Sequence, residues 1–332
     1  MPSNKTDTHV EHFVTLFDNN YLPLGLALHH SLMTQGQPFH LWIVCIDERV
    51  EQHLLQLSLP YVSLIGLHEV EDARLLAVKP SRNRAEYCWT LTPFTPEFVF
   101  KRDAQIERVT YLDADLFFFD TPKLLLDEFK HSDKDVLITE HAYDPRHDKS
   151  RKSGRFCVQF ISFRRTEGAM KVMHWWQERC LEWCYEKAED GKLGDQKYLD
   201  QWPILFDSEV HILRQKEKTL APWNVRYFEQ QSGGRVMPVF YHFHGFKIIS
   251  SDKALLYSGY SVGNAVESIY RPYLSCLSGK LTLLRQHGIQ MTFLPPRQDL
   301  LSKCLNIKRR IWGGMYYANF TSDATSQNEI AS

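Results

Sequence analysis

The sequence predicts an α/β fold built on a parallel sheet flanked by helices. Along the 332 residues, short apolar runs typical of strands alternate with segments whose apolar residues recur at helical spacing. This alternation is the pattern of a parallel sheet with crossover helices. A second observation is that the apolar run at 109–112 ends in two carboxylates, Asp113 and Asp115. Open sheets of this class place their ligand sites at the carboxyl ends of strands.

The predicted elements of the N-terminal part alternate in type. They are a strand at 13–17, a helix at 22–33, a strand at 39–46, a helix at 48–57, a short strand at 62–65 and a mainly helical stretch at 84–100. Because crossover connections are right-handed, the carboxyl ends of these strands should align on one edge of the sheet. The turn at 18–20 and the Asp-x-Asp motif are therefore expected on the same edge.

The later elements are less regular. A strand at 136–139 precedes a polar loop at 141–154, which we expect to act as a lid. A strand at 155–163 and an amphipathic helix at 166–189, ended by Gly191, follow. The helix carries an aromatic stripe that is expected to pack in the core rather than to bind sugar. The chain from 268 to 319 is predicted to form helical pieces.

Composition excludes several classes of function. The formal net charge is −1, so the chain is not strongly basic, and we expect no nucleic acid as a partner. The seven cysteines are odd in number and lack a framework spacing, which favours a reducing compartment. Cys180 and Cys184 are expected to be core thiols rather than zinc ligands. The polar N-terminus predicts that there is no signal peptide, and no apolar run reaches about 18 residues, so a cytoplasmic protein is expected.

Asp113 and Asp115 form the candidate centre of a site. Side chains at i and i+2 of a strand point to the same side, so the two carboxylates are expected to lie together. Burial of two like charges is costly unless a cation or a shared proton compensates them. A divalent cation is the favoured interpretation. The alternative is a strand-end turn with two solvated aspartates.

Three further motifs accompany this pair. They are Phe17-Asp18-Asn19-Asn20-Tyr21 after the first strand, Gly194-Asp195-Gln196, and His242-Phe243-His244-Gly245-Phe246-Lys247. Taken singly, each has an ordinary explanation: a turn, a helix N-cap and a structural histidine. In this order and spacing, the four motifs together resemble the retaining glycosyltransferases of family 8 over residues 13–247. The resemblance implies the GT-A fold, a Rossmann-like, mostly parallel mixed sheet flanked by helices.

The resemblance implies roles for the first two motifs. Asp18 and Tyr21, with Asn20 beside them, are expected to recognise the base of a nucleotide. A carboxylate can accept a hydrogen bond from the ring N–H of uracil, and an aromatic ring can stack on the base. Asp113 and Asp115 are expected to bind Mn²⁺, or Mg²⁺, at the diphosphate of the donor, where the cation stabilises the leaving group.

The resemblance also implies roles for the last two motifs. Gln196 is expected near the anomeric carbon of the donor sugar, and Asp195 is expected to hold sugar hydroxyls. His242 would complete the metal shell, while Gly245 would let the backbone approach a phosphate and Lys247 would contact it.

The sequence also departs from the family. The family usually has Asn-Ala-Gly on the strand after the lid; here Cys157 replaces Asn and Gln159 replaces Gly, so Gln159 is expected in an altered sugar pocket. The usual Arg before Asp-x-Asp has no clear counterpart, and Arg84, with Arg82 nearby, is the candidate. His244 is the alternative metal ligand.

The predicted function is metal-dependent transfer of a sugar from a nucleotide-sugar donor, expected to be a UDP-sugar, to a hydroxyl of a glycan or lipid-linked glycan in polysaccharide biosynthesis. The resemblance implies retention, with the diphosphate oxygen taking the acceptor proton. One alternative is an inverting GT-A enzyme with Asp195 or Asp144 as base. Another is a degenerate GT-A scaffold or glycan-binding protein, favoured by the altered strand. Trp223 and Asn224 are expected on the acceptor side.

The predicted organisation has three segments. Residues 1–267 form the GT-A nucleotide-sugar-binding catalytic domain, 268–320 a helical C-terminal extension and 321–332 a disordered tail. Basic and aromatic residues gather in 303–317. They suit either a helix lying peripherally on the cytoplasmic face of a membrane or a helix packed on the domain.

Overall fold

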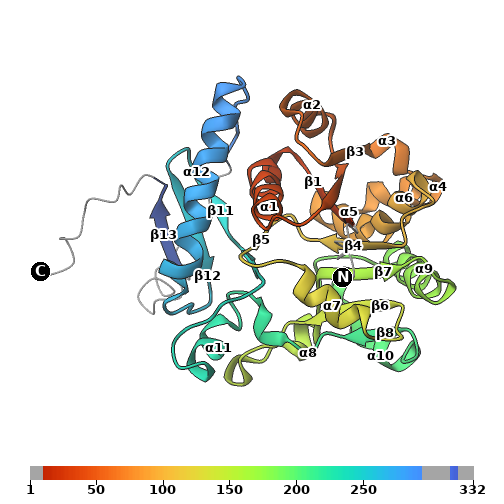
Figure 1. Cartoon of the computed structure of the whole chain (residues 1–332). Coiled ribbons are helices and arrows are strands. Elements are labelled where there is room, and N and C mark those ends of the chain that lie inside the picture. Colours follow the sequence, from red (N-terminus) through yellow and green to blue (C-terminus); the bar gives the residue numbers. More distant parts are fainter. Residues whose placement is uncertain (1–9, 294–314, 321–332) are drawn as a thin grey trace, which may run out of the picture.

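The computed structural model describes residues 10–293 and 315–320. Its main sheet has seven strands in the order β3-β2-β1-β4-β7-β6-β8 (Figure 1). The strands are β1 (Glu11–Phe17), β2 (Phe39–Cys45), β3 (Val62–Gly66), β4 (Arg108–Leu112), β6 (Val136–Glu140), β7 (Phe156–Arg164) and β8 (Val210–Ile212).

Strand direction places one end of several strands on a common edge. β1 runs parallel to β2 and β4, and β2 runs parallel to β3. β7 is antiparallel to its neighbours β4 and β6, and β8 is parallel to β6. The carboxyl ends of β1, β2, β4 and β6 therefore meet the amino end of β7 at one edge. The predicted mostly parallel, mixed sheet is confirmed.

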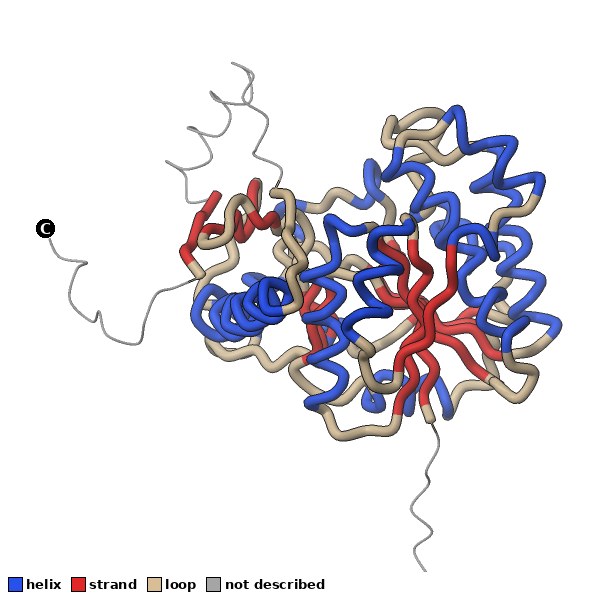
Figure 2. The backbone as a smooth tube through the Cα atoms, turned by 90° about the horizontal axis from the view of Figure 1, so that it is seen from above, coloured by secondary structure: helices blue, strands red, loops and turns tan. Residues whose placement is uncertain are grey.

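Helices cover both faces of this sheet (Figure 2). One face carries α1 (Leu22–Thr34), α2 (Glu48–Leu57), α7 (Lys123–Lys130) and α12 (Arg271–Gln286). The other carries α3 (Leu67–Val70), α4 (Ala73–Val78), α5 (Arg84–Leu91), α6 (Thr95–Arg102), α9 (Glu167–Glu182) and α10 (Trp202–Leu205). Alternation along β1 explains the two layers, because Phe13 and Phe17 pack on the first face and Val14 and Leu16 on the second.

Two smaller sheets extend the molecule. In one, β10 (Phe240–His242) lies between β5 (Leu116–Phe118) and β9 (Thr219–Leu220). In the other, β12 (Lys253–Ser258) lies between β11 (Lys247–Ile248) and β13 (Met315–Asn319). The other α-helices of the described residues are α8 (Ser150–Ser153) and α11 (Val225–Gln231), and a π-helical turn (Val266–Tyr270) leads into α12. A shared core joins α1, α12 and both small sheets.

Two predicted helices differ from the structure. α9 ends at Glu182, well before Gly191, because Trp183 adopts an extended conformation and its carbonyl accepts a hydrogen bond from the Tyr198 hydroxyl (2.7 Å). Residues 315–319, predicted as part of a helical extension, form strand β13, which pairs with β12. In both places a tertiary contact overrides the local preference. The rest of the predicted basic and aromatic segment, 303–314, lies outside the described residues.

Two further expectations, both about packing in the core, are met within the described ranges. Cys180 and Cys184 are free, buried core thiols. In the aromatic stripe, Trp176 is fully buried and Trp175 packs against the same core. No helix in 10–293 is long and apolar enough to cross a lipid bilayer.

Candidate active site at the carboxyl ends of the strands

The two carboxylates of the Asp-x-Asp motif lie in the turn that joins β4 to β5. β4 ends at Leu112, and the backbone N–H of Asp113 donates to the carbonyl of Gln159 on β7 (3.0 Å). The N–H of Leu116 then donates back to the Asp113 carbonyl (3.2 Å), which closes the turn. The motif therefore stands just beyond the strand rather than within it, yet both side chains point to the same place.

His242 brings a nitrogen ligand to this place from a distant part of the chain. It ends β10 and pairs in register with Leu116 of β5. Its Nε2 lies 3.2 Å from Asp115 Oδ1 and 3.7 Å from Asp113 Oδ2. One ligand atom from each of the three residues lies within 4.8 Å of the other two. His244 is not part of this group, although its ring centroid is 5.7 Å from that of His242.

The charges of the three groups are strongly coupled. Burial raises the pKa of Asp113 to about 6, with His242 opposing and Asp115 adding to this rise. Burial also opposes ionisation of Asp115, but the charge and hydrogen bond of His242 outweigh it, so the pKa of Asp115 lies below its usual value. Burial likewise opposes a charge on His242, but Asp115 outweighs it and raises the pKa of His242 well above its usual value. Without a cation, a proton on His242 therefore compensates these carboxylates.

The predicted nucleotide turn lies at the same edge, directly after β1. Asp18 is buried and caps a short 3₁₀ helix (Asn19–Tyr21), accepting hydrogen bonds from the N–H groups of Asn20 (2.9 Å) and Tyr21 (3.3 Å). Its second oxygen accepts from the Asn20 side chain (3.0 Å) and pairs with Arg84 (3.2 Å). The structure thus brings Arg84 to the turn. Part of the hydrogen-bonding capacity of Asp18 is already used.

Asp47 is a charged residue of this region that sequence reasoning missed. It follows β2 and lies 3.0 Å from the second guanidinium nitrogen of Arg84. It also accepts from the N–H of Asn19 (3.2 Å). Its position after a parallel strand is the same signal that singled out Asp18, and that signal would have found it.

Tyr21 reaches from this turn toward the carboxylates. The residue is 48% exposed. Desolvation of its hydroxyl and the charges of Asp115, Asp18 and Asp113 raise its pKa. An exposed ring with its hydroxyl near the cation ligands can contact a ligand that spans both places.

Asp195 and Gln196 follow Gly194, which has a positive φ of 54°. Asp195 is buried, and burial together with the charge of Asp113 raises its pKa to about 8. Its carbonyl accepts a hydrogen bond from the Trp176 indole (2.9 Å). The Gln196 amide donates to the carbonyl of Ser153 (2.8 Å) in the predicted lid. Asp195 is therefore close enough to the candidate cation ligand Asp113 to respond to its charge, and Gln196 contacts the segment 141–154.

The segment 141–154, predicted as an irregular lid loop, is irregular over only half of its length; a short 3₁₀ helix (Pro145–His147) and α8 make up the other half. Its first residue, His141, is held by two hydrogen bonds to its carbonyl, from the Trp223 indole (2.7 Å) and the Asn224 amide (2.9 Å). The Trp223 ring lies 5.3 Å from that of His242. Trp223 and Asn224 therefore anchor the lid beside the candidate cation site.

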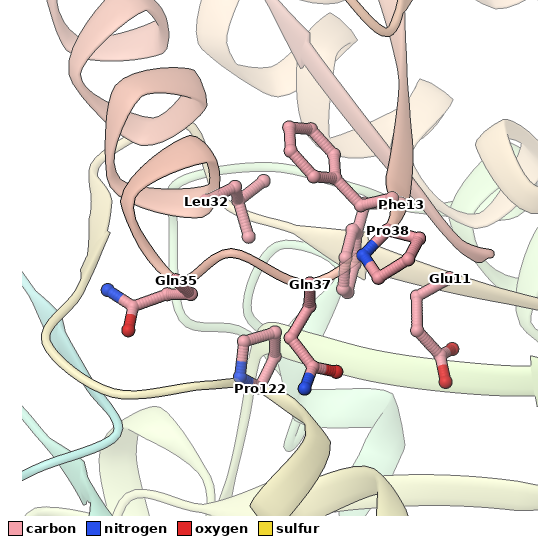
Figure 3. Close-up of a pocket in the computed structure, with 8 residues that line it drawn as sticks. Glu11, Phe13, Leu32, Gln35, Gln37, Pro38 and Pro122 are labelled. Atoms are coloured by element: carbon pink, nitrogen blue, oxygen red, sulfur yellow. The ribbon is translucent and has the colours of Figure 1, made fainter. Parts of the chain in front are cut away.

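The remaining predicted residues lie in or near this region. Gly245 has a φ of 77°, which suits glycine, and Lys247 at the start of β11 is exposed. Gln159 is fully buried, and its side chain contacts His242 rather than an open sugar pocket. A small cavity around Glu11, Leu32 and Gln37 lies at the opposite end of β1 (Figure 3) and does not belong to this site.

Comparison with known proteins shows the relatives of this chain. No family model matches it. YfnD of Bacillus subtilis (strain 168), an uncharacterised protein, is 30% identical over 274 residues, covering 79% of this chain and 87% of YfnD. YfnF of the same organism, also uncharacterised, is 31% identical over 250 residues, covering 72% of this chain and 82% of YfnF. The chain belongs to the family of YfnD and YfnF.

Solved structures that resemble this member of the YfnD family are glycosyltransferases. The apo bifunctional glycosyltransferase WbbM has a TM-score of 0.48 at 17% identity over 73% of this chain, and the match spans about half (47%) of WbbM. Mouse xyloside xylosyltransferase 1 has a TM-score of 0.48 at 14% identity, covering 71% of this chain and 98% of that one. Galactosyltransferase LgtC, in complex with donor and acceptor sugar analogues, has a TM-score of 0.47 at 15% identity, covering 70% and 87%.

Proposed function

We propose that this protein is a metal-dependent glycosyltransferase that takes its sugar from a nucleotide-sugar donor. The observation that carries the proposal is the convergence of Asp113, Asp115 and His242, within 4.8 Å of one another, at the edge where parallel strands end. The turn with Asp18 and Tyr21 lies at the same edge. Ligand sites of open α/β sheets lie at such an edge.

The three ligands fit a divalent cation of moderate hardness. Two carboxylate oxygens and one imidazole nitrogen suit Mn²⁺, and the carboxylates also suit Mg²⁺. The raised pKa of Asp113 (about 6) and the raised pKa of His242 reflect two carboxylates that lie beside a single imidazole, whose proton a bound cation would replace. A cation bound there would neutralise the negative charge that develops on a leaving diphosphate.

The donor is proposed to be a UDP-sugar. Asp18, Asn20 and Tyr21 would recognise the base, with Arg84 beside them, and Gly245 and Lys247 would face the phosphates. Support for this comes from the placement of the 18–21 turn beside the cation group and from the electrostatic coupling of Tyr21 to Asp115.

The transferred sugar is proposed to lie between the cation group and Gln196. Asp195 would hold its hydroxyls; in the metal-free protein, burial and the charge of Asp113 raise the pKa of this carboxyl to about 8. Transfer is proposed to proceed with retention, to a hydroxyl of a glycan or lipid-linked glycan in polysaccharide synthesis. In an inverting mechanism, Asp195 would be a better base than Asp144, whose pKa is lowered to about 2 by Arg146. NMR of the product anomer separates retention from inversion.

A panel of nucleotide sugars incubated with Mn²⁺ tests the proposal through release of the nucleoside diphosphate by slow hydrolysis. Wild-type protein should release UDP from one or a few donors, and chelation of the cation should stop release. The Asp127→Asn variant is a matched control, because Asp127 lies on α7 and pairs with Lys123 away from the site. A protein whose tryptophan fluorescence does not respond to UDP with Mn²⁺ would instead be a scaffold.

A further inference from the structure

Gln159 is a buried polar residue in the middle of the site. It lies on β7 and has no exposed surface. The altered strand made it a candidate for the sugar pocket, but the structure turns its side chain toward His242. A buried amide needs hydrogen-bond partners, because an unsatisfied one costs free energy. The partners of Gln159 therefore show what the residue does.

The amide of Gln159 holds one ring nitrogen of His242. Gln159 Oε1 lies 2.7 Å from His242 Nδ1, and both side chains are buried. The other end of the amide, Nε2, donates to the hydroxyl of Thr139 on β6 at 3.5 Å. The Thr139 hydroxyl itself donates to the carbonyl of Cys157 (3.5 Å), so it accepts from the amide nitrogen, and the amide oxygen faces the histidine. The imidazole must then donate from Nδ1.

A proton on Nδ1 determines what the other nitrogen can do. In the neutral ring, donation from Nδ1 leaves Nε2 with a free lone pair, and Nε2 is the atom that faces Asp115 (3.2 Å) and Asp113 (3.7 Å). Histidines that bind metals almost always donate their other N–H to such a partner, which fixes tautomer and ring orientation.

The backbone of the same residue holds the other half of the ligand group. The carbonyl of Gln159 accepts a hydrogen bond from the N–H of Asp113 (3.0 Å). One residue of β7 thus contacts a ligand from the β4–β5 turn through its backbone and a ligand from β10 through its side chain.

We propose that Gln159 is a positioning residue for the cation site, which holds His242 with Nε2 directed toward the carboxylates. The proposal rests on the proposed function only in that a divalent cation is bound by His242. Gln159 does not contact the cation or the donor itself. The substitution of glycine by glutamine relative to the resembled family thereby gains a physical role.

The test uses two variants and a control in the full chain. Gln159→Leu removes the acceptor while keeping a side chain of similar size, and Gln159→Glu restores an acceptor at the same place. The control is Gln177→Leu, which removes another buried glutamine, on α9, that bonds Pro93 and Glu97. Circular dichroism checks that each variant is folded.

The first readout is independent of any cation. In protein labelled with ¹⁵N-histidine, His242 should show a slowly exchanging Nδ1–H signal, assigned by its absence from His242→Asn. The signal should be lost in Gln159→Leu and kept in Gln159→Glu and Gln177→Leu. A signal that persists in Gln159→Leu overturns the proposal, since Nδ1 then has another partner.

The second readout is the Kd for Mn²⁺, measured by electron paramagnetic resonance of the free ion. Loss of such a partner weakens metal binding about 10–100-fold, so Gln159→Leu should show this loss and Gln159→Glu should regain affinity. If wild type and Gln159→Leu bind Mn²⁺ equally well, or if Gln177→Leu loses as much affinity as Gln159→Leu, the proposed role of Gln159 is overturned while the metal site itself stands. Wild-type protein that binds no Mn²⁺ overturns the metal site of the proposed function, and with it this role.

Discussion

Replacement of Asp115 by Asn removes one negative charge from the cation group and keeps the size of the side chain and one oxygen. Asp115 is ionised at neutral pH, because its pKa lies below the usual value through the charge and hydrogen bond of His242. The amide that replaces the carboxylate would present no charge to a cation. We expect Asp115→Asn to lose metal-dependent nucleotide binding and activity while the fold stays intact.

The distance in the structure gives the magnitude. Asp115 Oδ1 lies 3.2 Å from His242 Nε2, so two unit charges at these atoms attract by about 1.3 kcal/mol even with the dielectric constant of water, and by about 5 kcal/mol at an effective value of 20. A divalent cation doubles the charge that Asp115 faces. The variant should therefore lose at least roughly 2.5 kcal/mol of Mn²⁺ binding, close to a hundredfold in Kd.

Calorimetric titration of UDP in the presence of Mn²⁺ measures this loss, and UDP release measures activity. Asp127→Asn should behave as wild type in both assays, because Asp127 pairs with Lys123 on α7. The reasoning is refuted if a folded Asp115→Asn protein turns over donor at the wild-type rate or binds Mn²⁺ with unchanged affinity.

Three other predictions follow from the same site and from the C-terminal segment. His242→Ala should impair UDP binding with Mn²⁺ more than His244→Ala, since His242 alone of the two joins the carboxylates; the opposite ranking by calorimetry would assign the ligand role to His244. The pKa of Asp195 is about 8 in the fold against an ordinary 3.8, so the native state of the metal-free protein binds more protons between these values and loses stability as pH rises, by up to about 1.4 kcal/mol per pH unit. Asp195→Asn should lack this pH dependence, and urea unfolding of both proteins at pH 5 and pH 8 checks it. If the difference in unfolding free energy between wild type and variant is the same at both pH values, the shifted pKa is contradicted. If 303–317 contacts membranes, the full chain should co-sediment with anionic vesicles, less so with added salt, and truncation after Leu300 should abolish binding; equal recovery of both proteins in the supernatant excludes the contact.

Much of the fold could be predicted because the signals are local. The alternation of apolar runs and helical spacing shows the parallel part of the sheet, and the C-terminal ends of β1 and β4 place Asp18 and the Asp-x-Asp motif on one edge. The end of α9 and strand β13 could not be predicted in this way. A hydrogen bond from Tyr198 holds Trp183 in an extended conformation, and pairing with β12 makes 315–319 a strand.

By itself, the sequence determined which residue types stand at the strand ends: two carboxylates beyond β4, an acidic turn beyond β1 and a pair of histidines near 242. Only the tertiary structure decided which histidine meets the carboxylates and why its ring is oriented as it is. Gln159 and His242 are 83 positions apart in the chain and touch at 2.7 Å. They meet because β7 pairs antiparallel with β4 and because β10 pairs with β5, the strand that follows β4. Periodicity reports which face a side chain occupies within its own element, whereas the partner across that face depends on how distant elements pack.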